Sequence, residues 1–124
     1  MKKLISLLVL GLMLAAPSAA ALTADEAREC QALANSFGPA KAAVNKKVAE
    51  RDALAEATEA AGEAWENAEN VRTLSAEAAA EADELRAVWE EKKVEFNALE
   101  SDLFTQSTKL NKDLARFNYL CVSE

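Results

Sequence analysis

The stretch NVRTLS, residues 70–75, separates two long segments that both have the composition of helices. Alanine, the strongest helix former, supplies 17 of the 48 residues from 40 to 87, and neither segment shows the alternating pattern of a strand. Asn70 can cap a helix in a left-handed conformation, and Thr73 or Ser75 can cap the start of the next helix. The stretch therefore predicts a reversal near residues 70–75, although it contains neither glycine nor proline.

The segment after the reversal, from about Ser75 to Leu120, carries one regular apolar stripe. Every member lies within about 60° of Leu99 on a helical wheel, and the mean repeat, close to 3.6 residues, predicts a nearly straight helix. Lys92 and Gln106 interrupt the stripe. They can set register or oligomeric state, as polar core residues do in coiled coils, or Lys92 can extend its aliphatic stem along the groove and keep its ammonium in water. The stripe consists of Leu74, Ala78, Leu85, Val88, Phe96, Leu99, Leu103, Leu110, Leu114, Phe117 and Cys121.

The segment before the reversal predicts two helices rather than one. Thr23 and Glu26 fit a capping box at the start of a short N-terminal helix over residues 22–38. Gly38 suits the C-terminal cap of that helix, and Pro39 suits the first position of the next. We therefore expect a corner at this Gly-Pro pair, and the sequence leaves open whether the short helix folds back as a third helix.

The first residues have the form of a bacterial signal peptide. Two lysines precede a short apolar run, residues 4–16, which is well below the ~20 residues that a spanning helix needs. A proline and small residues with an A-x-A-like cleavage site follow this run. We expect residues 1–21 to be removed and the remaining chain to reach the periplasm or to be secreted, without a membrane span.

Two cysteines, Cys30 and Cys121, lie near opposite ends of the chain expected after cleavage. In an oxidising compartment one disulfide explains them most simply, and no C-x-x-C spacing favours a redox-active pair. A bond within one chain places the reversal at NVRTLS and sets Gly62 opposite Trp89. In the chain-entropy model, closing so long a loop contributes roughly 4–5 kcal/mol. We therefore predict an all-α fold in which residues 39–124 form an antiparallel, coiled-coil-like helical hairpin.

Two alternative assemblies remain open on sequence grounds. A single helix from Pro39 to Leu120 would be about 120 Å long, and its apolar stripe would need a second chain, with disulfides between antiparallel copies. The hairpin can also form a homodimer, because flanks such as Trp89 and Phe104 stay partly uncovered. Aromatic residues at helical spacing are usually core residues, so we expect Trp65 and Trp89 to pack between the helices rather than to bind a ligand.

The composition argues against catalysis. The chain has no histidine, the commonest general base and metal ligand, and it has no glycine-rich phosphate loop, G-x-S-x-G elbow or C-x-x-C-H haem motif. Loss of the two leader lysines leaves 12 basic against 21 acidic residues, a net charge of −9, which argues against nucleic-acid binding. We expect no enzyme activity, no cofactor, no metal site and no nucleic-acid partner.

Negative charge is concentrated around the reversal. Residues 56–84 contain nine acidic residues against Arg72 alone, a net charge of −8. In a hairpin these residues become an acidic tip, which is either a solvated face that maintains solubility or a docking surface for a cationic protein. Pairs of acids one helical turn apart also allow a weak divalent-cation site, although no oxygen-rich loop accompanies them. The candidate partner-binding residues, called the acidic tip below, are Glu56, Glu59, Glu63, Glu66, Glu77, Glu81 and Glu84.

These observations predict an exported, non-enzymatic helical-hairpin protein that acts by protein–protein contact in the bacterial cell envelope. Its protein partner is not identified by any motif. Two other functions stay open: a periplasmic chaperone-like protein that binds unfolded clients in an apolar groove, and a small-ligand or cation-binding protein that uses the acidic tip. Suppression of client aggregation would favour the first, and a rise in melting temperature with calcium would favour the second.

Overall fold

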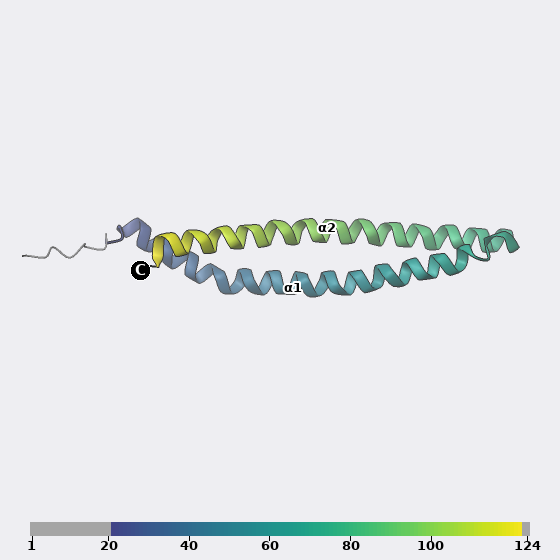
Figure 1. The fold of residues 1–124 in the computed structure, drawn as a ribbon, viewed down its shortest axis with the longest axis horizontal. Coiled ribbons are helices and arrows are strands. Elements are labelled where there is room, and N and C mark those ends of the chain that lie inside the picture. Colours follow the sequence, from purple (N-terminus) through teal and green to yellow (C-terminus); the bar gives the residue numbers. More distant parts are fainter. Residues whose placement is uncertain (1–20, 123–124) are drawn as a thin grey trace, which may run out of the picture.

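The computed structural model, which describes residues 21–122, is an antiparallel hairpin of two helices (Figure 1). Helix α1 spans Ala24–Glu69, the short 3-10 helix η1 spans Arg72–Leu74, and helix α2 spans Ala76–Cys121. Each long helix has 46 residues and is therefore about 69 Å long. The predicted all-α hairpin is confirmed, and the single uninterrupted rod is wrong. The predicted leader lies outside the described residues except for its last position.

Side-chain caps begin both long helices. The Thr23 hydroxyl accepts a hydrogen bond from Glu26 N at 3.1 Å, and Glu26 Oε2 accepts one from Thr23 N at 2.8 Å, which confirms the capping box. Ser75 caps α2, because its hydroxyl accepts a hydrogen bond from Ala78 N at 3.0 Å. The left-handed cap expected at Asn70 is wrong: this residue is right-handed, with φ −61° and ψ −25°. The 3-10 helix η1 carries the chain through the reversal instead.

The corner expected at Gly38 and Pro39 is also wrong, because α1 continues through both residues. One set of half-buried and buried positions of α1 is spaced alternately by three and four residues. This repeat passes Pro39 without a shift, whereas a corner there would have displaced it. Gly38 has no Cβ to clash with the proline ring, a clash that normally disfavours a helical residue before proline. The positions in this repeat are Cys30, Leu33, Phe37, Ala40, Val44, Lys47, Arg51, Leu54, Thr58, Ala61, Trp65 and Ala68.

The inner face of α2 follows a seven-residue repeat rather than the expected 3.6-residue stripe. Its positions are Ala78, Ala82, Leu85, Trp89, Lys92, Phe96, Leu99, Leu103, Gln106, Leu110, Asp113, Phe117 and Leu120. This is the period of coiled-coil packing. Three members of the expected stripe are exposed instead: Leu74 at 77%, Val88 at 44% and Leu114 at 38%. Among residues 21–122 only Ala68, Ala82 and Leu103 are buried, so the core is a thin line between two helices.

The end of the hairpin opposite the reversal is closed covalently and by packing, and is called the disulfide end below. Cys30 bonds Cys121 with Cα atoms 5.7 Å apart. The rings of Phe37 and Phe117 meet edge to face, with centroids 5.4 Å apart. These contacts hold the first turns of α1 against the last turns of α2. Their members on α1, Cys30 and Phe37, both precede Pro39.

Candidate functional site

The structure brings the seven predicted tip residues to one end of the hairpin. Four come from the second half of α1 and three from the first turns of α2, and the two groups approach the reversal from both sides (Figure 1). All seven side chains are exposed. They are exposed because none of them occupies a position of the inner repeat of its helix, which faces the other helix.

The carboxylates of the two ends differ in their partners. Towards the disulfide end, seven acids have a basic partner, in the pairs Asp25–Arg28, Glu29–Arg116, Glu50–Lys46, Asp52–Arg51, Glu100–Arg51, Asp102–Lys47 and Asp113–Lys109. Near the reversal, Arg72 is engaged by Glu69 at 3.2 Å and Asp83 at 2.7 Å. Within residues 21–122, none of the seven acidic-tip residues forms an ion pair. Two further cations in this part of the hairpin, Arg86 and Lys93, lie over the rings of Trp65 and Trp89 instead of pairing with the tip.

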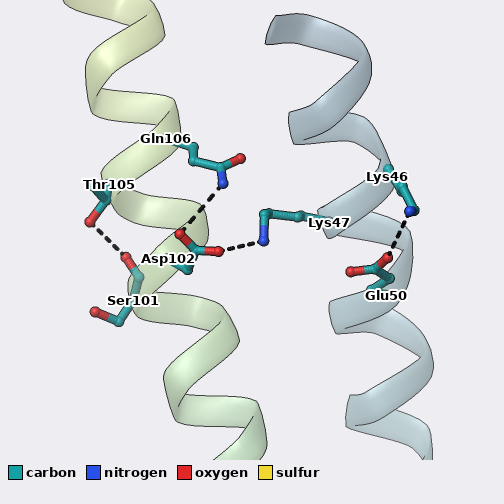
Figure 2. Close-up of polar contacts among 7 residues, drawn as sticks. All are labelled: Lys46, Lys47, Glu50, Ser101, Asp102, Thr105 and Gln106. Atoms are coloured by element: carbon teal, nitrogen blue, oxygen red, sulfur yellow. Dashed lines mark hydrogen bonds and ion pairs between the residues drawn. The ribbon is translucent and has the colours of Figure 1, made fainter. Parts of the chain in front are cut away.

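Two basic residues on the inner face of α1 cross to α2. Lys47 extends from α1 and donates to Asp102 on α2 (Figure 2). One turn further along α1, a guanidinium nitrogen of Arg51 lies 3.7 Å from Glu100 Oε1. The Asp102 hydrogen bond raises the pKa of Lys47, and that of Arg51 is raised, first by its hydrogen bond with Asp52.

Sequence reasoning did not assign the two crossing pairs. The disulfide could have indicated them. It determines which residues of the two helices face each other, and the members of each pair lie close to such facing positions. A shift of one helix along the other would separate both pairs, so they favour the observed register.

The two tryptophans pack on each other near the reversal. Trp65 and Trp89 stack with ring centroids 4.8 Å apart and planes 16° apart, and both are half-buried between the helices. The predicted proximity of Gly62 and Trp89 is confirmed, because a Cβ at Gly62 would lie 3.1 Å from Trp89 Nε1. The ammonium of Lys93 lies 3.7 Å from the Trp89 ring centroid. The pair therefore belongs to the helix–helix interface.

The inner face thus has a packing role. Among the described residues, no group of three or more acids or cysteines is arranged to hold a metal ion. No helix in the same part of the chain has a stretch that is long and apolar enough to cross a membrane. Comparison with protein-family models, with curated proteins and with solved structures gives no match. The acidic tip is therefore the candidate functional site on its geometry and charge alone.

Proposed function

We propose that this chain is an exported, non-enzymatic helical-hairpin protein that acts by protein–protein contact in the bacterial cell envelope, with the acidic tip as the contact surface. The observation that carries the proposal is the difference between the two ends of the hairpin. Seven carboxylates towards the disulfide end have basic partners, whereas the seven of the acidic tip have none within the described residues.

The arrangement suits a partner with a lysine- or arginine-rich surface. Exposed like charges create a field that steers an oppositely charged protein, and they affect association rate and specificity more than they affect affinity. The two stiff helices, each about 69 Å long, hold the acidic tip well away from the disulfide end. A partner can therefore reach the tip without contact along the rest of the hairpin.

Capture from an envelope extract tests the proposal, with the mature oxidised protein as bait. The triple variant Glu59→Gln, Glu63→Gln and Glu66→Gln removes three tip charges. The matched control, Ala42→Lys, Asn45→Lys and Ala49→Lys, changes the net charge by the same amount at exposed positions of α1 outside the acidic tip. We expect the tip variant to lose a partner that the wild type and the control retain. We also expect retention to fall as salt rises from about 50 mM to about 500 mM, because screening shortens the reach of the tip charges.

Three results would contradict the contact function. One is that no protein is retained, and another is that the tip and control variants lose the partner equally. A third is that the wild type and the tip variant suppress the aggregation of an unfolded client equally, which favours the chaperone-like alternative. A rise in melting temperature with calcium that disappears in the tip variant would instead favour cation binding, since a ligand of the folded state stabilises that state.

A further inference from the structure

The side of α2 that faces away from α1 changes character partway along the helix. Its central line also follows alternate spacings of three and four residues, about half a turn away from the inner repeat. Near the reversal this line contains glutamates, in the order Glu77, Ala80, Glu84, Ala87 and Glu91. Beyond Glu91 it contains no acid at all. This second part is called the outer seam, and it consists of Val94, Ala98, Ser101, Thr105, Thr108, Lys112, Ala115 and Tyr119.

Large apolar side chains are exposed on and beside the outer seam. Val94 is 69% exposed, Tyr119 is 84% exposed and Phe104, which flanks the seam, is 74% exposed. An open hollow of about 320 Å³ lies at the middle of the seam, lined by Phe104, Thr105, Thr108, Lys109 and Lys112. Exposed aromatic side chains and the lack of acids are two features that this line shares with the cores of protein interfaces.

We propose that a second copy of this chain packs antiparallel on the outer seam and forms a reversible, non-covalent dimer. The two-fold axis lies between Gln106 and Ser107. A dimer with this symmetry uses the same surface on both copies, so each contact occurs twice. The axis sets Val94 against Tyr119, Ala98 against Ala115, Ser101 against Lys112, and Thr105 against Thr108.

The outer seam is self-complementary about this axis. Ala98 faces Ala115 and Thr105 faces Thr108, which allows the two helices to approach closely there, and the large apolar residues Val94 and Tyr119 face each other at both ends. Phe104 and Lys109 lie on opposite flanks of the seam, and the two-fold operation keeps each flank on its own side, so Phe104 of each copy lies beside Asn111 of the other. The hollow, which three seam residues help to line, lies at the centre of the proposed contact.

Charge decides the antiparallel orientation. A parallel pair would bring two acidic tips together, whereas an antiparallel pair sends them to opposite ends. The overlap also ends where the acids begin, because Glu91 lies just past Val94 and faces the end of α2 in the second copy. The part of the line without acids therefore matches the length over which two antiparallel copies overlap.

The contact area predicts a weak dimer. The outer seam spans 26 residues, about 39 Å of helix with a width of about 10–12 Å, which is roughly 400 Å² on each copy. Stable interfaces bury about 800 Å² on each partner. We therefore expect a weak association that depends on concentration. The dimer does not depend on the proposed function, although it would present two acidic tips in opposite directions.

Sedimentation velocity of the mature oxidised protein, from about 10 μM to about 1 mM, tests the dimer. Ser101→Glu places a carboxylate opposite Lys112 of the second copy, twice by symmetry, and should tighten the dimer about threefold to tenfold. Thr105→Glu adds the same charge beside the two-fold axis, where its copies approach each other, and should weaken the dimer about tenfold or more. Ala87→Glu adds this charge to the line outside the outer seam and should leave the dimer unchanged within about twofold.

These variants change exposed positions, and far-UV circular dichroism checks that each keeps the helix content of the wild type. A wild type that stays monomeric at about 1 mM overturns the proposal. A dimer that Ser101→Glu and Thr105→Glu shift in the same direction also overturns it, because the proposed register predicts opposite signs for equal charges.

Discussion

Replacing Gly62 with alanine tests a close contact between the two helices. In a helix interior, alanine is favoured over glycine by about 0.8–1 kcal/mol, so an unobstructed site would gain stability. A Cβ at Gly62, however, would lie 3.1 Å from Nε1 and 3.4 Å from Cδ1 of Trp89. Trp89 cannot move away freely, because Trp65 stacks on it at 4.8 Å and the Lys93 ammonium lies 3.7 Å from its ring centroid.

Two costs oppose the helical gain at Gly62. Rotation of Trp89 away from its preferred side-chain angles costs about 0.5–1.5 kcal/mol, and loosening the aromatic stack costs about 0.5–1.5 kcal/mol. Set against a gain of about 1 kcal/mol, these costs predict that Gly62→Ala lowers the free energy of unfolding by about 1 kcal/mol. For a domain of this size, the melting temperature should fall by about 4–8 °C.

Thermal and urea unfolding, followed by far-UV circular dichroism, measure the change. Ala60→Gly is the matched control for helix propensity, because Ala60 is exposed in the same region of α1, and it should lower the free energy of unfolding by about 0.8–1 kcal/mol. In a Trp89→Phe background, which lacks the closest atom, Gly62→Ala should no longer destabilise the protein. If Gly62→Ala stabilises the wild type as much as Ala60→Gly destabilises it, the reasoning from this contact is refuted.

Three other perturbations follow from the structure. Reduction of the single disulfide, which joins residues 91 positions apart, should lower the free energy of unfolding by about 4 kcal/mol; equal urea midpoints with and without reductant would contradict this expectation. Leu103→Ala should cost about 2 kcal/mol in urea unfolding, whereas Leu74→Ala, at a side chain 77% exposed, should change the free energy by less than about 0.5 kcal/mol. The hydrogen bond from Arg116 lowers the pKa of Glu29, so this pair stabilises the fold above the ordinary pKa of Glu29 and ceases to do so as the pH falls through the lowered folded-state pKa. Glu29→Gln should therefore lose less melting temperature than the wild type between about pH 7 and about pH 3; equal losses would show that the pair has no effect.

Local signals predicted the caps at Thr23 and Ser75 and the pairing of the two helices. Thr23, Glu26 and Ser75 form caps through hydrogen bonds within four residues of sequence, so their role can be recognised without knowledge of the fold. Cys30 and Cys121, once assumed to bond, determine which parts of the two helices face each other. The exposure of the acidic tip follows from the same helical periodicity.

Two expectations were wrong because they used local preference where packing decides. Gly38 and Pro39 favour a corner in isolation, but the inner repeat of α1 continues without a shift past Pro39. The wheel placed Val88 in the stripe, whereas the seven-residue repeat turns Trp89 inward. Sequence reasoning assigned no role to Lys47, because its crossing to Asp102 depends on the second helix.

The amino-acid sequence by itself determined that the chain forms two long helices, where they reverse, and which carboxylates lie near the reversal, because helix formation and capping depend on neighbours within about one turn. Only the tertiary structure decided which line of each helix is inside, that α1 continues through a proline, and which carboxylates find basic partners. Those outcomes depend on contacts between residues far apart in the chain, and the helix register sets all of them together. A rotation of either helix by about half a turn would exchange its inner and outer positions without altering the helical propensity of either segment.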